Sequence, residues 1–389
     1  MIKVRKFNKI SDAIYDYMAK SKYEFLDDGN KYDAAIVRSQ ELKNEEFPKE
    51  LLAIARAGAG VNNIPVERLT EAGVCVFNTP AANANAVKEL VLCGMLLSCR
   101  RIISGAEWVK EQAEDGASDI SITMEKAKKN FIGREISGKK LGIIGLGAVG
   151  AMVANSALAL NMEVIGYDPF LSVQAALRLS PDVKIANDIN EIYKKCDFIS
   201  LHVPQTPETK GMINKDVLKK FKKDAVLLNF ARGGLVNDEA ILDALDNGKL
   251  GRYVTDFPNE TIAVNRNVIA TPHLGASTPE AEENCAIMAA KELDEYIRTG
   301  NIRNSVNLPA CDMPFSGGYR VAIINKNVPN MVGQITAVLA GEEHNIDHMI
   351  NRSRGDFAYT MIDITDKPSR DCIKKLEAIA GIIRVRVIG

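Results

Sequence analysis

The first hundred residues alternate short apolar runs with stretches of helical spacing. The apolar runs at 34–37, 51–54 and 74–77 predict strands. The segment from Ala86 to Ile103 carries its apolar side chains at helical spacing and ends in Arg100-Arg101, which suits the negative end of a helix dipole. We therefore expect a parallel α/β block with one long, mostly buried helix.

A second block repeats this alternation more clearly, beginning near Gly138. Its strand candidates are separated by helical stretches and lie at 141–144, 163–167, 198–202, 225–229 and 268–270. This order is typical of a doubly wound nucleotide-binding sheet. Residues 301–318 are rich in Asn, Pro and Gly, which predicts a linker.

The residues after this linker read β-α-β-β-α-β, the order of a small ferredoxin-like domain. The expected strands are 320–325, 345–353, 357–365 and 385–388, and the expected helices are 330–342 and 369–380. The fold class is therefore predicted as α/β, with two doubly wound Rossmann-like domains and a C-terminal βαββαβ domain.

Composition narrows the classes of function. The 389 residues include 49 Lys and Arg against 50 Asp and Glu, so the formal charge is −1. Such a balance lacks the basic field that non-specific nucleic-acid binding needs, and we expect no nucleic-acid partner. The seven cysteines are scattered without a C-x-x-C pair, which disfavours a disulfide framework and a structural zinc site, and no metal is expected.

Two stretches bear on localisation. The N-terminus is charged within its first six residues and has no apolar run, so we expect no secretory signal and a cytoplasmic protein. Residues 141–162 carry no charge over a length that could cross a bilayer. Because four glycines and two asparagines interrupt this stretch, we interpret it as a buried strand, turn and helix, and expect no membrane partner.

The turn in this stretch has the dinucleotide-binding pattern G-x-G-x-x-G at Gly145, Gly147 and Gly150. It follows an apolar strand and opens an Ala-rich helix, whose N-terminal N–H groups can hold a pyrophosphate. Asp168 ends the next strand candidate, where its carboxylate can accept from both ribose hydroxyls of adenosine. The same carboxylate would repel a 2′-phosphate, so NAD is expected rather than NADP.

Three chemically suited side chains follow strand candidates. Arg232 in Asn-Phe-Ala-Arg-Gly-Gly can bind a carboxylate two-to-two, and Glu260 and His273 supply a carboxylate and an imidazole for proton transfer. All three stand at carboxyl ends of strands, where open α/β sheets bind ligands. The combination suits hydride transfer at a 2-hydroxy acid.

The order Arg232, Glu260, His273 behind the glycine motif closely resembles the D-isomer-specific 2-hydroxyacid dehydrogenase family over essentially the whole chain. By this resemblance His273 is the acid/base, Glu260 its hydrogen-bonded partner and Arg232 the carboxylate anchor. The resemblance also implies further cofactor-binding residues, namely Ala148, Val149, His202, Val203, Phe230, Ala231, Asp256, Gly275 and Ala276. In relatives the Glu segment reads Asp-Val-Phe-x-x-Glu-Pro, whereas here Glu260 stands one residue closer to Asp256 and lacks the following Pro.

A phosphorylated substrate needs cations away from the reacting carbon. Arg38 and Arg56 follow strand candidates of the first block, and the resemblance places them near the substrate together with Gly58, Ala59 and Asn83. The alternative is that both are solvated surface arginines without a binding role. The resemblance implies NAD-dependent oxidation of 3-phospho-D-glycerate to 3-phosphooxypyruvate, the first step of L-serine biosynthesis.

The last 70 or so residues resemble an ACT regulatory domain, whose sheets pair between chains and bind amino acids at the junction. The resemblance maps a possible L-serine effector site onto Asn325, Asn327 and Asn345, although serine-regulated relatives carry His and Gly where this chain has Asn325 and Asn330. The alternative is an oligomerisation module that binds nothing. A homodimer or homotetramer is expected, because two segments could each form a two-fold interface.

The expected domains are a discontinuous substrate-binding domain at 1–98 and 277–308, an NAD-binding Rossmann domain at 99–276, and an ACT-like domain at 318–389. Two other functions stay open. One is another D-2-hydroxyacid dehydrogenase, of the D-lactate or hydroxypyruvate reductase type. The other is a non-catalytic NAD-sensing binding protein, since fold does not imply function.

Overall fold

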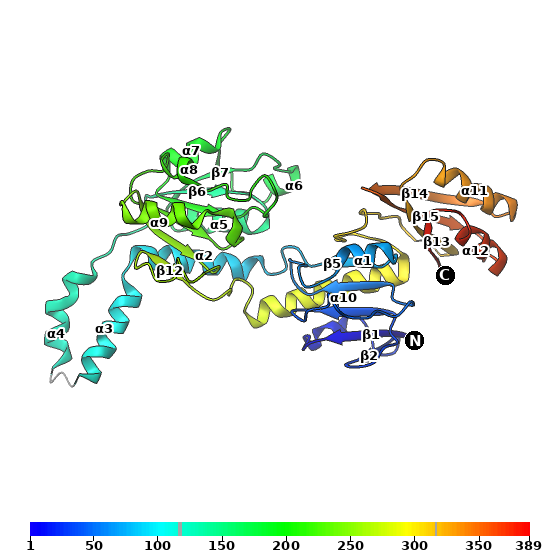
Figure 1. Ribbon diagram of the computed structural model, residues 1–389, viewed down its shortest axis with the longest axis horizontal. Coiled ribbons are helices and arrows are strands. Elements are labelled where there is room, and N and C mark those ends of the chain that lie inside the picture. The colour runs from blue at the N-terminus through cyan, green and yellow to red at the C-terminus, as the bar shows by residue number, and fades with distance from the viewer. Residues whose placement is uncertain (116–118, 316) are drawn as a thin grey trace. The chain divides into compact units, whose positions relative to one another are not determined.

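The structure is a computed structural model that describes residues 1–115, 119–315 and 317–389. The chain forms two compact units, Met1–Asn83 with Pro279–Gly389, and Ala84–Thr278 (Figure 1). The boundary therefore falls before helix α2 (Ala84–Cys99), whereas the sequence had suggested residue 98. Helix α2 belongs to the second unit because its Gly94 lies against the sheet there, where an added Cβ would be 2.8 Å from the Phe230 ring.

The second unit is built on a parallel sheet in the order β12-β11-β10-β9-β6-β7-β8. Its strands are β6 (Lys140–Ile144), β7 (Glu163–Tyr167), β8 (Lys184–Ile185), β9 (Phe198–Leu201), β10 (Ala225–Asn229), β11 (Leu250–Thr255) and β12 (Val268–Ala270). The strand positions predicted for this block are confirmed to within a residue. Because parallel strands buried on both faces are nearly all apolar, their short Val/Ile/Leu runs were visible in the sequence.

Helices cover both faces of this sheet. Helices α2 and α5 pack on one face, and α7, α8 and α9 pack on the other. The helices and 3₁₀ turns of this unit, apart from α2, are α3 (Ile102–Glu114), α4 (Ile120–Ala127), η2 (Lys128–Phe131), α5 (Ala148–Ala159), α6 (Val173–Ala176), α7 (Ile189–Lys195), α8 (Lys215–Leu218), η3 (Gly233–Leu235) and α9 (Asp238–Asp246). The uncharged stretch 141–162 forms β6, the glycine turn and α5, as predicted. Among the described residues, no helix combines the length and apolar character needed to cross a bilayer.

The long helix expected over Ala86–Ile103 is interrupted. It ends at Cys99, whose carbonyl accepts a hydrogen bond from the backbone N–H of Arg134 (3.1 Å) instead of continuing the helix. Helix α3 then begins at Ile102 and lies against α4 (Figure 1). None of the described residues of α3 and α4 is buried. Their sequence had not indicated this helix pair.

The first unit begins with a parallel sheet in the order β2-β1-β3-β4-β5. Its elements are β1 (Ile2–Phe7), η1 (Asp12–Asp16), β2 (Tyr23–Leu26), β3 (Ala34–Val37), β4 (Ala53–Arg56), α1 (Val66–Glu71), β5 (Cys75–Asn78) and α10 (Pro279–Thr299). The sequence had indicated β3, β4 and β5 but not β1 and β2. In β1 the buried residues Val4 and Phe7 are three positions apart and belong to the cores on opposite faces of the sheet, with Arg5 and Lys6 between them, so no apolar run or alternation marked this strand in the sequence.

The segment expected as a linker is packed into the first unit. Asn307 is buried, and its side chain accepts from the N–H of Val76 (2.8 Å) and donates to the carbonyl of Val74 (2.9 Å) and to Thr70 Oγ1 (2.9 Å). Ile302 and Cys311 also pair through their backbones. Asn and Pro therefore mark a fixed, hydrogen-bonded connection here rather than a free tether.

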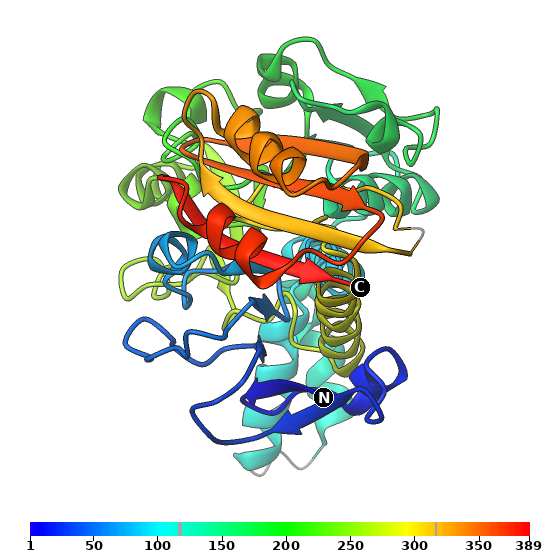
Figure 2. The same ribbon diagram turned by 90° about the vertical axis from the view of Figure 1, so that its right-hand side faces the viewer.

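The C-terminal residues form an antiparallel sheet in the order β14-β15-β13-β16. Its elements are β13 (Tyr319–Lys326), α11 (Met331–Gly341), β14 (Ile346–Arg354), β15 (Phe357–Ile364), α12 (Arg370–Glu377) and β16 (Ile382–Ile388), which confirms the predicted βαββαβ order. Both helices cover one face (Figure 2), where Val321 and Ile323 meet Leu339 and Leu376. The other face joins the core of the first unit.

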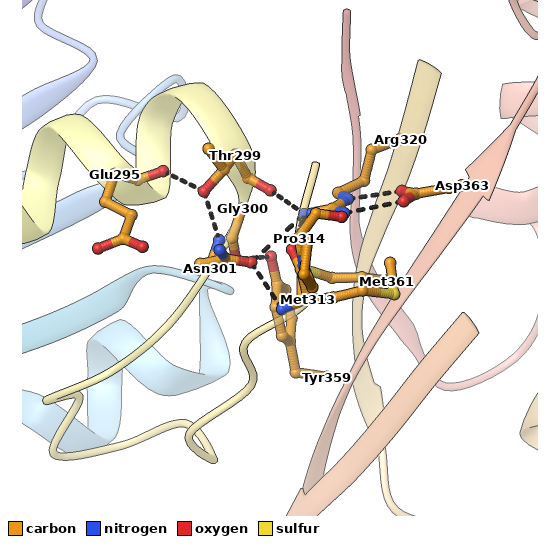
Figure 3. A network of polar contacts seen from close by, with 10 residues as sticks. All are labelled: Glu295, Thr299, Gly300, Asn301, Met313, Pro314, Arg320, Tyr359, Met361 and Asp363. Carbon is orange, nitrogen blue, oxygen red and sulfur yellow. Dashed lines mark hydrogen bonds and ion pairs between the residues drawn. The ribbon is translucent and has the colours of Figure 1, made fainter. Parts of the chain in front are cut away.

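A buried arginine ties this C-terminal sheet to the rest of its unit (Figure 3). Arg320 is fully buried, and its Nε and Nη2 donate to the two carboxylate oxygens of Asp363 at 2.6 and 2.9 Å. The same guanidinium donates to the carbonyls of Thr299 (2.7 Å), Met313 (3.0 Å) and Pro314 (2.9 Å). Because Thr299 ends α10, one side chain joins the sheet to that helix.

A buried carboxyl lies in the same unit, on α10. The Glu292 side chain accepts from Asn304 Nδ2 at 2.5 Å through Oε1, while Oε2 is buried without a partner among the described residues. Burial raises the pKa of Glu292 from 4.5 to about 7. Folding therefore favours the protonated form, and stability falls as pH rises from 4.5 through 7 because the folded state must then ionise a buried group.

This carboxyl generates a pH-dependent prediction. Each pKa unit corresponds to about 1.4 kcal/mol, so the stability of Glu292→Gln relative to wild type should rise by about 2–3 kcal/mol between pH 5 and pH 8. Urea unfolding of the full chain at both pH values measures this difference. Glu283→Gln, an exposed position on the same helix, should show no such trend. Equal pH dependence in both variants would contradict the assignment.

Candidate active site

The three motif glycines each have a separate geometric reason to be glycine. Gly145 has φ +94°, and an added Cβ would lie 2.6 Å from the carbonyl oxygen of His202. At Gly150 an added Cβ would lie 2.0 Å from the carbonyl oxygen of Gly145, so helix α5 could not begin where it does. At Gly147 the added atom would meet open space. The turn thus packs tightly on the sheet side and stays open at the helix N-terminus.

The N-terminus of α5 and Asp168 form the next part of this site. Gly147 caps α5 without a side chain, so the first N–H groups of the helix have no side-chain partner there. Asp168 follows β7, is half-buried, and accepts from the N–H of Leu146 and of Phe170, both at 2.9 Å. The carboxylate therefore stands beside the glycine turn, as the motif spacing predicted. Ala148 and Val149 form the first turn of α5.

His202 and Val203 follow β9 on the other side of this turn. The His202 ring Nε2 lies 2.8 Å from Ser200 Oγ, and its backbone N–H donates to Ile144 at 2.8 Å. Burial of the ring lowers the pKa of His202 to about 4, so the imidazole is neutral at physiological pH. The Val203 side chain lies 2.9 Å from where a Gly145 Cβ would be. Both residues therefore border the glycine turn.

The loop that carries Arg232 is organised by a buried asparagine. Asn229 Nδ2 donates to the Arg232 carbonyl (3.0 Å) and to the Tyr253 hydroxyl (3.2 Å), and Asn229 Oδ1 accepts from the N–H of Ala231 (3.3 Å). Arg232 Nη1 in turn donates to the Ala231 carbonyl (2.7 Å). Phe230, between them, is buried. The sequence motif alone does not assign a role to Asn229, and the signal for its positioning role is a polar residue at the end of an apolar strand.

Asp256 carries an unsatisfied buried oxygen. Its Oδ2 accepts from the N–H of Gly275 (3.0 Å), whereas Oδ1 is buried and has no partner among the described residues. Burial raises the pKa of Asp256, and the nearby charge of His273 opposes this rise. A buried acceptor without a donor is costly, so this oxygen suits a ligand N–H such as that of a carboxamide. Ala276 follows Gly275 and is half-buried.

His273 and Glu260 are not brought together as expected. The His273 ring is exposed and packs against Phe257, with ring centroids 4.6 Å apart. Glu260 is also exposed, and its carboxylate has no hydrogen bond or ion pair among the described residues. Asn259 instead bonds to Asp238 of α9 (2.5 Å) and caps its own turn, which holds the shortened segment in place. The expected hydrogen bond between Glu260 and His273 is therefore absent from this structure.

The predicted substrate residues cluster within the first unit. Arg38 directly follows β3 and forms an ion pair with Glu282 of α10 (2.5 Å). Arg56 ends β4, and its Nε donates to the Arg38 carbonyl (3.1 Å). Gly58 lies so close that an added Cβ would meet the Arg56 guanidinium at 1.8 Å. The strand-end placement of the two arginines is as predicted.

Gly58 and Ala59 are held by hydrogen bonds from residues that end and follow β5. The Ala59 carbonyl accepts from Asn78 Nδ2 (2.6 Å), and Thr79 N–H donates to the Gly58 carbonyl (3.1 Å). Asn83 is the last residue of the first segment of this unit and is half-buried. Two arginines beside a glycine turn are side chains of the kind that bind an anion.

The three asparagines predicted for an effector do not form one group within the chain. Asn325 is buried with Oδ1 unpartnered among the described residues, and Asn327 at the end of β13 donates to Gly355 (3.1 Å). Asn345 precedes β14 and bonds to Asp347 (3.2 Å). Tyr319 and Ile346 both pair with Ile364, so Asn345 lies at the start of β13 and Asn327 at its far end. At about 3.3 Å per residue these ends are roughly 25 Å apart.

The second unit as described fits a dinucleotide. The open space at Gly147, the α5 N-terminus, the carboxylate of Asp168 and the unpartnered Oδ1 of Asp256 are suited to a pyrophosphate, a ribose and a carboxamide in turn. No group of three or more His, Cys, Asp or Glu side chains among the described residues is arranged to hold a metal ion.

Comparisons with known proteins agree with this geometry. Residues 92–275 match the model of the NAD-binding domain of D-isomer specific 2-hydroxyacid dehydrogenases. A D-3-phosphoglycerate dehydrogenase of Methanocaldococcus jannaschii is 37% identical over 298 residues, which cover 74% of this chain and 54% of that protein. The chain thus spans about half the length of this relative. The D-3-phosphoglycerate dehydrogenase of Haemophilus influenzae is 32% identical over 356 residues, 88% of this chain and 82% of that protein.

A solved structure is also similar. The NAD+-bound 3-phosphoglycerate dehydrogenase of Entamoeba histolytica aligns with a TM-score of 0.61 and 26% identity, over 79% of this chain and 98% of that one. The glycine turn with Asp168, the matched NAD-binding domain and the extended similarity to the Haemophilus protein lead to one conclusion. The chain belongs to the D-isomer specific 2-hydroxyacid dehydrogenase family and carries its NAD-binding domain.

Proposed function

We propose that this protein oxidises 3-phospho-D-glycerate to 3-phosphooxypyruvate with NAD+, the first step of L-serine biosynthesis, and does so in the cytoplasm. The names of the similar proteins support this activity. The structural observation that carries the choice of a phosphorylated acid is the pair Arg38 and Arg56. These arginines share the carboxyl ends of β3 and β4 with the Gly58 turn.

The proposed chemistry assigns one role to each side chain. Bound NAD+ supplies the hydride acceptor for C2 of the substrate. His273 takes the proton of the C2 hydroxyl as the C–H bond breaks, and the planar guanidinium of Arg232 binds the substrate carboxylate. The exposed position of the His273 ring leaves it accessible to substrate. Asn229 positions the Arg232 loop through its two hydrogen bonds.

Glu260 and Asp256 have separate proposed roles. Asp256 is committed through Oδ2 to Gly275, and its buried Oδ1 is assigned to the nicotinamide carboxamide. Glu260 has no partner among the described residues. In the sequence it is the one carboxylate residue that lies between Asp256 and His273. We assign it as the hydrogen-bonding partner of His273 in the complex with substrate, because apo geometry is often looser than that of the working complex.

One observation favours a second candidate function. Arg38 is already paired with Glu282, and a guanidinium neutralised by a carboxylate is a weaker phosphate ligand. A dehydrogenase for an unphosphorylated acid, of the D-lactate or hydroxypyruvate reductase type, would tolerate this pair. A substrate phosphate carries up to two charges and can compete with Glu282, since that ion pair is about two-fifths exposed.

We propose inhibition by L-serine only at a site that two copies of the chain form together. Asn327 and Asn345 lie at opposite ends of their sheet. A site that used both would therefore need the C-terminal sheets of two copies, which makes a homodimer or homotetramer a condition of inhibition. The ACT assignment of this sheet rests on its βαββαβ order.

Substrate preference tests the function directly. We expect kcat/KM for 3-phospho-D-glycerate to exceed that for D-glycerate and D-lactate at least a hundredfold, measured by NADH formation. Arg56→Gln should lower kcat/KM for the phosphorylated acid about ten- to a hundredfold, since a hydrogen bond between charged groups contributes about 1.5–3 kcal/mol. The same change should leave the value for D-glycerate nearly unaltered. Equal rates on both acids would support the second candidate instead.

Proton transfer is tested by three substitutions. His273→Gln should lower kcat/KM by about 10²–10⁴-fold, the usual contribution of a general base. Glu260→Gln should move the acidic limb of the kcat/KM profile to lower pH, because loss of a neighbouring carboxylate makes a protonated imidazole less favourable. Asp256→Asn should raise KM for NAD+ and leave that limb in place.

His348→Gln, at an exposed position of β14, serves as the control and should have wild-type kinetics. If the acidic limb of the kcat/KM profile moved in Asp256→Asn but not in Glu260→Gln, Asp256 rather than Glu260 would be the hydrogen-bonding partner of His273.

Cofactor preference is tested at Asp168. Asp168→Ser should raise KM for NAD+ about ten- to a hundredfold, because hydrogen bonds from the ribose to a charged acceptor are lost. Both Asp168→Ser and Asp168→Asn should raise the NADP+/NAD+ ratio of kcat/KM, since each removes the charge that repels a 2′-phosphate. Asp168→Asn keeps an oxygen that can accept from the Leu146 N–H. It therefore tests the loss of the negative charge without loss of this local hydrogen bond. An unchanged ratio in both would refute the proposed basis of NAD preference.

A further inference from the structure

A cavity outside the proposed active site lies along β12, the edge strand of the sheet in the second unit. Its volume is about 680 Å³. The walls come from the end of α2, the start of α3, strand β12 and the loops that follow β11 and β12. This size falls within the range of about 300–1,000 Å³ that is typical of small-molecule sites.

Arginines dominate the polar lining of this cavity. Arg100 and Arg101 lie between α2 and α3, Arg252 lies on β11 and Arg266 in the turn before β12. No Asp or Glu is among the described residues that line it. Within the described parts of the chain, none of these four guanidinium groups forms an ion pair or a side-chain hydrogen bond. Four positive charges thus share one cavity without a counter-charge.

The surroundings of Arg252 disfavour its positive charge. Arg252 is half-buried, and burial, together with the positive charges of Arg101 and Arg134, lowers its pKa. Arg134 itself is satisfied elsewhere, since it donates to the Asp224 carbonyl (3.4 Å). A guanidinium remains charged even under such repulsion, so the cost persists until an anion neutralises it.

Apart from Ser104 and Thr271, the rest of the lining is apolar. Leu97, Ile269 and Pro272 contribute carbon surface between the arginines. A ligand that fits both parts has several anionic groups on a short carbon body. A single monovalent ion would neutralise only one of the four charges and would leave the apolar wall uncovered.

We propose that this cavity is a binding site for a small organic polyanion, with two or more phosphate or carboxylate groups, separate from the proposed active site. Planar guanidinium groups bind either kind of group through paired hydrogen bonds. Pro258 and Pro272 line the cavity and belong to the loops that carry Glu260 and His273. The cavity therefore borders both loops. The proposal does not depend on which hydroxy acid is the substrate.

Binding to the full chain tests this proposal. Isothermal titration with pyrophosphate and, separately, with citrate, at constant ionic strength and with saturating NADH, identifies which anionic group is preferred. Arg252→Gln/Arg266→Gln should weaken binding of the preferred probe at least tenfold and leave NADH binding unchanged. The charge-matched control Lys367→Gln/Arg370→Gln, at exposed positions of the C-terminal region, should bind like wild type. Arg266→Gln alone, at an exposed position, supplies a conservative variant if the double substitution affects folding, and should weaken binding at least threefold.

Several outcomes would overturn the proposal. Unchanged affinity in the cavity variants, or equal weakening in the charge-matched control, would show binding elsewhere or a general charge effect. Failure of both probes to bind the wild type would also reject it. If light scattering showed that the double variant changes oligomeric state while pyrophosphate and citrate binding persists, the arginines would belong to an interface between subunits. None of these readouts uses turnover, so a failure of the proposed dehydrogenase activity would be distinguishable.

Discussion

The close approach between helix α5 and the glycine turn is the constraint on which the nucleotide-binding half of this protein depends. An atom added at Gly150 would lie 2.0 Å from the Gly145 carbonyl, so α5 can start directly behind β6 only with glycine there. That start point places the helix N-terminus beside Asp168 at the end of β7 and beside His202 at the end of β9. The carboxyl ends of β10, β11 and β12 extend the same edge of the sheet, and from them come Arg232, Asp256 and His273. Because all parallel strands have their carboxyl ends at the same edge of the sheet, chemically unlike side chains that follow them come together there.

Burial distinguishes carboxylates that look alike in the sequence. Asp256 is nearly inaccessible and has one oxygen unpartnered among the described residues, whereas Glu260, four residues later, is exposed. The first has been desolvated by folding and is suited to a fixed hydrogen bond with a ligand. The second retains its hydration and can move to a partner at small cost. The difference assigns the two groups to different tasks more clearly than their spacing does.

In the first unit a buried ion pair inside the C-terminal sheet adds hydrogen bonds to α10 beside the apolar core that both sheets share. Arg320 and Asp363 neutralise each other, and the remaining guanidinium donors are satisfied by α10 and the segment that follows it. Such an arrangement fixes geometry, because a buried charge that lost its partner would be costly. The C-terminal sheet is thus held to α10, the helix whose Glu282 pairs with Arg38 near the proposed phosphate site.

The amino-acid sequence by itself determined the features that depend on local spacing. Five strand positions of the second unit, the glycine turn with Asp168, the strand-end arginines and the βαββαβ order all follow from periodicity and motif distance, and all appear in the structure. Tertiary packing decided the rest. It ended α2 at Cys99, whose carbonyl found the distant N–H of Arg134. It turned the expected linker into packed chain through Asn307, and it left Glu260 apart from His273 while Asn259 bonded to Asp238. It also gathered four arginines from separate segments into one cavity. Each of these depends on partners far away in sequence, and no local pattern carries the identity of a distant hydrogen-bond donor or charge.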